Sequence, residues 1–257
     1  MRALLVSSCC ALTSCALFPA PIPMAWLSDA RPGGQARCLL VFLPGAGDHA
    51  DAFRRQGFID AVRDKHLSVD IVSADATLGY YNRGTVAERL EVDVMGPAGA
   101  RGYQETWLAG TSMGGAGVLL YAQQQRPGQV QGALLMSPYL GSSDVVAEVR
   151  AAGGLTQWRA PAAEPSTSEN YARQLWRWLQ EVTVKGEPGP ELDVGWGDVE
   201  KLADADSLLA EALPADQVYR APGGHGWSTW RVIFAQWLER STFARRCVDS
   251  DRSNRHD

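Results

Sequence analysis

Short apolar runs recur along this sequence, and most are followed by a stretch whose apolar residues have helical spacing. The first run, Cys38–Leu43, is apolar at every position, which is typical of a strand buried on both faces. Similar runs occupy residues 69–72, 107–109, 133–136, 192–196 and 218–219, and helical patterns occupy residues 51–65, 86–95, 113–125, 202–213 and 228–240. Because alternating strands and helices are joined by right-handed crossovers, the chain is predicted to form an α/β fold. Its mostly parallel central sheet should carry helices on both faces.

One domain accounts for most of the chain. With 257 residues, 46% of them hydrophobic, the sequence is long enough for one sizeable core, which we expect over residues 38–247, followed by a polar tail at 248–257. Residues 141–190 break the strand and helix rhythm and are predicted to form a small helical lid insertion. A net charge of −5 without a run of Lys or Arg gives no site for nucleic acid, and we expect a monomer.

The N-terminus is typical of an export signal. Residues 1–14 place one Arg before a short apolar run, and Leu12-Thr13-Ser14-Cys15 resembles the bacterial lipoprotein box, in which the Cys is lipidated. We therefore predict a lipoprotein-type signal peptide at 1–14, a linker at 15–37, and a cell-envelope protein that touches the membrane only through a lipid on Cys15. Two alternatives stay open: cleavage that leaves a soluble periplasmic protein, or a cytoplasmic protein that starts at Met24.

Two cysteines, Cys38 and Cys247, remain outside the leader. They could form a disulfide in an oxidising compartment, or they could be two unrelated free thiols. No spacing of Cys and His suits a metal site, so no metal is expected.

The motif G-x-S-x-G occurs at residues 110–114, where a predicted strand turns directly into a predicted helix. This context favours a nucleophilic Ser112 on a sharp turn, with the Met113 amide as a donor to an oxyanion beside it. A second donor is expected in the turn after the first strand, where Ala46 is the candidate. A dinucleotide-binding turn is the other interpretation of that loop, but the third glycine is missing.

A general base and an acid are expected after the last two strands. His225 lies between glycines, just before the last helix, in the chain order that a Ser, acid and His triad requires. The acid is Glu200, three residues after Gly197, or Asp198, with neighbours such as Asp204 as a further alternative. Its role would be to fix the tautomer of the imidazole and to stabilise the imidazolium.

Together these segments resemble the bacterial group named Putative esterase within the α/β-hydrolase superfamily. The residues that carry the resemblance are Pro44-Gly45-Ala46-Gly47, Gly110-Thr111-Ser112-Met113-Gly114-Gly115, Ser137-Pro138-Tyr139 and Gly223-Gly224-His225-Gly226-Trp227. The resemblance implies an α/β-hydrolase fold and a cofactor-free serine hydrolase that forms an acyl-enzyme intermediate. Glu200 departs from the Asp that is usual in the superfamily.

Aromatic residues near the expected rim of the site are candidates for substrate binding: Tyr80, Tyr139 and Trp227. The favoured substrate is a small-molecule carboxylic ester. The same machinery would also serve a thioesterase or a peptidase. An inactive, surface-anchored binding protein is the alternative from a different class.

Overall fold

The computed structural model describes residues 18–249. The predicted signal peptide at 1–14, the candidate lipidation site Cys15 and most of the polar tail therefore lie outside the described residues. Within the described part, no helix is both long enough and apolar enough to cross a membrane.

A seven-stranded sheet forms the centre of the molecule, in the order β1-β3-β2-β4-β5-β6-β7. The strands are β1 (Trp26–Asp29), β2 (Cys38–Leu43), β3 (Val69–Ala74), β4 (Glu105–Thr111), β5 (Gly132–Met136), β6 (Glu191–Gly197) and β7 (Val218–Ala221). All neighbouring pairs are parallel except β1 with β3. The predicted mostly parallel α/β sheet is confirmed, and each of the six expected runs forms a strand.

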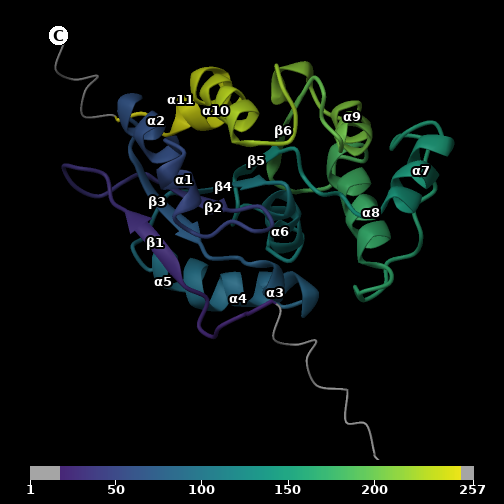
Figure 1. Ribbon diagram of the computed structural model, residues 1–257, viewed down its shortest axis with the longest axis horizontal. Coiled ribbons are helices and arrows are strands. Elements are labelled where there is room, and N and C mark those ends of the chain that lie inside the picture. The colour runs from purple at the N-terminus through teal and green to yellow at the C-terminus, as the bar shows by residue number, and fades with distance from the viewer. Residues whose placement is uncertain (1–17, 250–257) are drawn as a thin grey trace, which may run out of the picture.

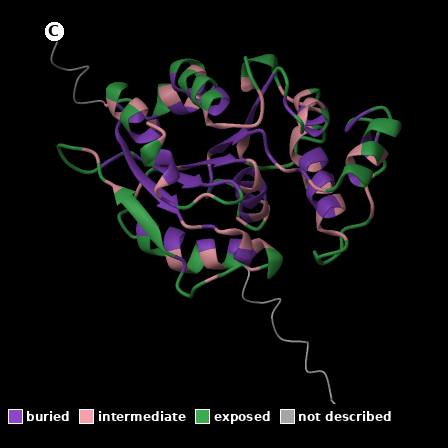
Figure 2. Cartoon of the chain, in the orientation of Figure 1, coloured by how far each residue is buried: buried purple, intermediate pink, exposed green. Residues whose placement is uncertain are grey.

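Helices cover both faces of this sheet (Figure 1). In β2 the side chains of Leu39, Val41 and Leu43 enter one core cluster, and those of the intervening residues enter the other. One face is covered by α1 (Ala52–Arg55), α2 (Phe58–Asp64), α10 (Trp227–Arg240) and α11 (Thr242–Arg246). The other is covered by α3 (Leu78–Asn82), α4 (Val86–Leu90), α5 (Gly96–Gly99), α6 (Met113–Ala122), α8 (Tyr171–Thr183) and α9 (Ala203–Ala210). Figure 2 shows the central strands buried between the layers, with β1 exposed at the edge of the sheet and exposed residues on the outer sides of the helices.

Two predicted helices are interrupted. The helix expected at residues 51–65 is divided into α1 and α2 because Gly57 adopts a left-handed backbone with φ of 79°. The helix expected at residues 86–95 changes after α4 into a π-helical turn, Glu91–Met95, which leads into α5. Pro97 follows that turn and has no N–H with which to continue regular α-helical hydrogen bonding.

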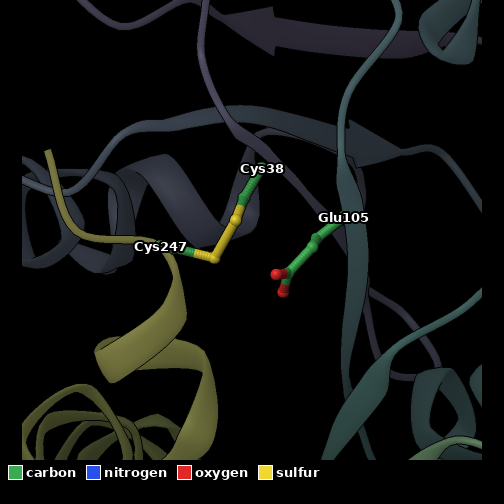
Figure 3. Close-up of side chains that lie close together, drawn as sticks. All are labelled: Cys38, Glu105 and Cys247. Atoms are coloured by element: carbon green, nitrogen blue, oxygen red, sulfur yellow. A yellow bond between two sulfur atoms is a disulfide. The ribbon is translucent and has the colours of Figure 1, made fainter. Parts of the chain in front are cut away.

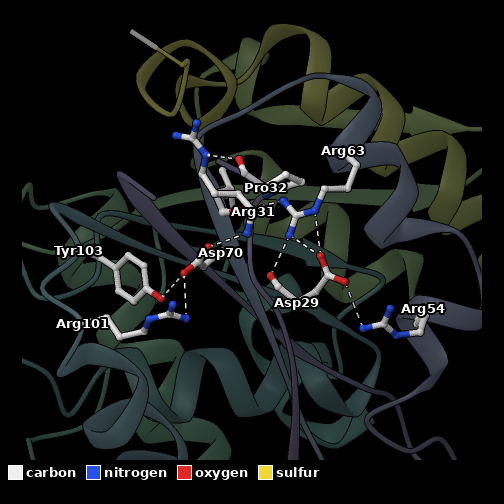
Figure 4. A network of polar contacts seen from close by, with 9 residues as sticks. Asp29, Arg31, Pro32, Arg54, Arg63, Asp70, Arg101 and Tyr103 are labelled. Carbon is white, nitrogen blue, oxygen red and sulfur yellow. Dashed lines mark hydrogen bonds and ion pairs between the residues drawn. The ribbon is translucent and has the colours of Figure 1, made fainter. Parts of the chain in front are cut away.

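The segment predicted as a linker, residues 15–37, contributes an unpredicted edge strand, β1. Asp29 at its end and Asp70 in β3 anchor this segment through a polar network (Figure 4), whose other members include Arg31, Arg54, Arg63, Arg101 and Tyr103. The strand was not predicted from the sequence because it has only four residues and no buried apolar run. Its hydrogen bonds to β3 protect an edge that would otherwise expose unpaired backbone groups.

A disulfide joins Cys38 at the start of β2 to Cys247, which follows α11 (Figure 3). The two Cα atoms are 5.8 Å apart, and both residues are buried. Of the two alternatives left open by the sequence, the structure therefore has the bonded pair. Cys38 pairs in register with Glu105 at the start of β4, so the disulfide lies at the amino ends of the central strands.

The predicted lid insertion at residues 141–190 contains α7 (Ser143–Ala151) and α8. It is fastened to the domain, because Trp176 of α8 is fully buried and its indole Nε1 donates a hydrogen bond to the Leu140 carbonyl at 2.8 Å. The base of the insertion is thus part of the main core.

Candidate active site

Ser112 occupies a sharp turn between β4 and α6, at the carboxyl edge of the sheet. Its backbone has φ of 52° and ψ of −117°, a strained conformation for a residue other than glycine. The flanking glycines make the turn sterically feasible. A Cβ on Gly110 would lie 2.4 Å from the Gly114 carbonyl oxygen, and one on Gly114 would lie 2.0 Å from the Leu43 carbonyl oxygen. The G-x-S-x-G spacing is therefore required by the close approach of β4, α6 and β2.

The backbone of Ser112 is held on both sides by the segment that follows β5. Its amide donates to the Met136 carbonyl, and its carbonyl accepts from the Tyr139 amide, both at 2.9 Å. Ser137, between these partners, also has a positive φ, of 45°, and donates its amide to the Gly195 carbonyl. Hydrogen bonds from several strands thus preserve the strained conformation of Ser112.

His225 lies on the loop between β7 and α10, and its ring reaches Ser112. Its Nε2 is 2.9 Å from the Ser112 Oγ, across 113 positions of sequence. Trp230 of α10 packs edge-on against the imidazole, with ring centroids 5.2 Å apart. The indole Nε1 of Trp230 also donates to the Ser137 Oγ at 3.1 Å. Trp230 therefore links the loop that carries His225 to the segment that holds Ser112.

Glu200 is the carboxylate that contacts His225. Its Oε1 is 2.9 Å from the His225 Nδ1 and accepts a second hydrogen bond from the Leu202 amide at 3.0 Å. The side chain of Glu200 is completely buried, so water does not compete for these hydrogen bonds. Asp198, the other acid that the sequence allowed, is exposed and pairs with Arg220 at 3.3 Å. It lies on the same loop but is turned toward solvent and is not joined to His225.

The two backbone donors proposed from the sequence lie on either side of Ser112. Met113 begins α6, so its amide is at the positive end of the helix dipole. Ala46 is exposed on the turn after β2, next to Gly45, where a Cβ would lie 3.3 Å from the Ser112 Cβ. Among the described residues, neither amide donates a hydrogen bond to another group of the protein. Both N–H groups are therefore free to bind an oxyanion.

The three aromatic residues predicted at the rim have different environments. The prediction that Tyr80 binds substrate is wrong. Tyr80 is buried in the core, and its hydroxyl donates to the Pro21 carbonyl of the N-terminal segment. Trp227 packs edge-on against Phe53, Phe58 and Trp230, so its ring is engaged in the aromatic cluster beneath α10. The burial of Tyr80 was not predicted, because the segment that covers it, which contains Pro21, was expected to be a linker.

Tyr139 is the aromatic residue attached most directly to the nucleophile, through its backbone hydrogen bond to Ser112. Its side chain is partly exposed and lies beside Tyr171, the first residue of α8. Burial, together with the neighbouring Tyr139 hydroxyl, raises the pKa of Tyr171. This pair connects the rim of the site to the lid insertion.

One group of possible metal ligands occurs in the described part of the chain: Cys38, Glu105 and Cys247 (Figure 3). Its sulfur atoms are joined to each other, and the Glu105 carboxylate accepts hydrogen bonds from Arg246 and Trp107. These groups are thus engaged in other bonds, at the opposite edge of the sheet from Ser112.

Sequence reasoning missed Ser137 and Trp230 as supports of the site. Trp230 lies within the helical pattern predicted at residues 228–240, and this pattern carries no signal for a role at the site. The positive φ of Ser137 has no signature in the sequence, although the dipeptide Ser137-Pro138 after a strand marks an irregular turn.

A parallel sheet with a strained serine at the strand-to-helix turn of β4, and a histidine beyond the last strand, defines an enzyme of the α/β-hydrolase class. The protein family described as "Putative esterase" matches residues 92–240, more than half of the chain, and this range contains Ser112, Glu200 and His225. The chain belongs to this family, and it is a hydrolase that acts on ester bonds. No curated protein sequence matches it.

Solved structures of the same fold include S-formylglutathione hydrolase from Staphylococcus aureus, with a TM-score of 0.56 and 14% identity over 87% of this chain and 98% of that one. S-formylglutathione hydrolase from Agrobacterium tumefaciens has a TM-score of 0.53 and 11% identity over 90% and 98% of the two chains. Est1E from Butyrivibrio proteoclasticus, solved with ferulic acid bound, has a TM-score of 0.52 and 17% identity over 84% and 95%. At these identities the likeness concerns the fold.

Proposed function

We propose that this protein hydrolyses small carboxylic esters through an acyl-enzyme intermediate on Ser112. The observation that carries the proposal is the continuous chain of hydrogen bonds from the Ser112 Oγ through the His225 ring to the buried Glu200 carboxylate, each 2.9 Å long. This order of nucleophile, base and acid is the arrangement that activates a serine hydroxyl at neutral pH.

In the first half of the reaction, the Ser112 Oγ attacks the ester carbonyl carbon while the His225 Nε2 takes the hydroxyl proton. The carbonyl oxygen becomes an oxyanion, which the Ala46 and Met113 amides bind. When the tetrahedral intermediate collapses, the ester C–O bond breaks and the imidazolium returns the proton to the departing alcohol. The products of this half are the alcohol and the acylated Ser112.

In the second half, water attacks the acyl carbon and His225 takes one of its protons. The second tetrahedral intermediate then collapses, releasing the carboxylic acid and returning the proton to the Ser112 Oγ. Glu200 accepts the hydrogen bond from the His225 Nδ1, which directs Nε2 toward Ser112 and stabilises the imidazolium.

A fluorophosphonate probe and p-nitrophenyl acetate test this proposal together. We expect the folded wild-type protein to be labelled and to release p-nitrophenol, and we expect Ser112→Ala to do neither. Ser228→Ala, which removes an exposed serine three positions after His225, is the matched control and should behave as the wild type. Folded wild-type protein that neither reacts with the probe nor hydrolyses the ester would instead support the binding-protein alternative.

A further inference from the structure

Asp206, in the first turn of α9, is a buried carboxyl group that the proposed reaction does not use. Its side chain has no exposure, and neither of its carboxyl oxygens has a hydrogen-bond partner among the described residues. An ionised carboxylate without a partner is strongly disfavoured in such an environment. Burial raises the pKa of Asp206 well above its usual range, the negative charge of Glu200 raises it further, and Arg220 opposes the shift. The neutral, protonated form of the Asp206 carboxyl is therefore favoured over the ionised form.

Asp206 is close to the acid of the proposed triad. The Leu202 amide donates to the Glu200 Oε1, and the Leu202 carbonyl accepts from the Asp206 amide at 3.2 Å. Leu202 is thus hydrogen-bonded both to the Glu200 side chain and to the backbone of Asp206, at the start of α9. The second oxygen of Glu200, Oε2, is also buried and has no partner among the described residues.

The Asp206 carboxyl and the Glu200 Oε2 are complementary as hydrogen-bond donor and acceptor. A protonated carboxyl has one O–H that requires an acceptor, and the Glu200 Oε2 is a buried acceptor that requires a donor. Arg220 of β7 opposes the increase in the pKa of Asp206 that Glu200 causes. Arg220 is itself paired with Asp198 and stacks on the Trp196 ring at 4.4 Å.

The charged side chains of α7, which packs against α9, are engaged elsewhere. Arg150 binds the exposed Asp204, and Glu148 binds Arg173 and the Trp158 indole. None of them supplies a donor to Glu200 or to Asp206 among the contacts of the described residues.

We propose that Asp206 is a positioning residue for the triad, whose protonated carboxyl supplies the hydrogen-bond donor that the Glu200 Oε2 lacks. This inference rests on the proposed function. The donor stabilises the ionised form of Glu200 and restricts its rotation, so that Oε1 stays on the His225 Nδ1. Of these two buried acids, Glu200 contacts His225 and Asp206 holds Glu200 in place.

Two substitutions at Asp206 separate this role from simple packing. Asp206→Asn keeps the shape and a neutral donor, whereas Asp206→Leu keeps similar bulk and removes the donor. We expect Asp206→Leu to lower kcat for p-nitrophenyl acetate about tenfold with little change in KM, because a hydrogen bond to a charged group is lost.

Asp206→Asn should retain most of the wild-type kcat. Asp204→Leu, on the same helix but at an exposed position, is the matched control and should leave kcat and KM unchanged. The proposal is overturned if the folded Asp206→Leu protein matches the wild type, or if Asp206→Asn loses as much activity as Asp206→Leu.

A second measurement does not depend on ester hydrolysis. The proton on the His225 Nδ1, which faces Glu200, is observed by NMR, and its resonance should move in Asp206→Leu and stay in place in Asp206→Asn. If the wild type fails to react with the fluorophosphonate, the proposed function fails, while this resonance still tests the contact between Asp206 and Glu200. An unchanged resonance in Asp206→Leu refutes the positioning role.

Discussion

Replacing Glu200 with Gln tests the geometry of the site with little change in side-chain size. The Glu200 Oε1 accepts hydrogen bonds from both the His225 Nδ1 and the Leu202 amide. A glutamine amide can present its oxygen to both donors but brings no negative charge to stabilise the imidazolium. If its NH₂ group turns toward the imidazole instead, it favours the tautomer with the proton on Nε2, which cannot take a proton from Ser112.

The loss of a properly charged acid in such a triad lowers kcat by up to about 10⁴-fold, which corresponds to about 5.4 kcal/mol of transition-state stabilisation. We expect Glu200→Gln to show a loss approaching this size in p-nitrophenyl acetate hydrolysis, with KM much less affected. Asp198→Asn is the matched control on the same loop. It should retain full activity, because Asp198 is exposed and pairs with Arg220.

Circular dichroism of both variants shows whether the fold is kept. The reasoning is refuted if folded Glu200→Gln keeps more than a tenth of the wild-type kcat, or if Asp198→Asn loses activity comparably. Either result would mean that a carboxylate other than Glu200 acts on His225.

Two further predictions concern stability. Replacing both Cys38 and Cys247 with Ala opens a cross-link between residues 209 positions apart, and should lower the free energy of unfolding in urea by about 5 kcal/mol. The esterase kcat should be unchanged at temperatures where the variant is folded, and a loss of stability below about 1 kcal/mol would contradict the cross-linking effect. Burial raises the pKa of Asp193, whose carboxylate accepts from the Trp237 indole, to about 7. Between about pH 4 and 7 the folded state then binds more protons than the unfolded state, so stability falls as pH rises, by up to about 1.4 kcal/mol per pH unit. Asp193→Asn should flatten this dependence in urea unfolding at pH 5 and pH 8, and a slope equal to that of the wild type would refute the assignment.

The parallel sheet and the strand-to-helix turn at Ser112 could be predicted because their signals are local. Buried strands appear as apolar runs, and the crowding at a nucleophile turn requires glycine at fixed spacing around the serine. The edge strand β1 and the burial of Tyr80 could not be predicted in this way. Both arise when the N-terminal segment folds back onto β3 and α3, a long-range contact with no periodic pattern.

The sequence by itself determined the class of fold, the positions of Ser112 and His225 in the chain order, and the two acids between which a choice had to be made. The tertiary structure decided between the two acids, because the loop after β6 buries Glu200 against His225 and leaves Asp198 exposed to solvent. It also decided that Cys38 meets Cys247. These contacts depend on distances between side chains that are far apart in the sequence, or on the directions in which neighbouring side chains point. The order of residues alone specifies neither.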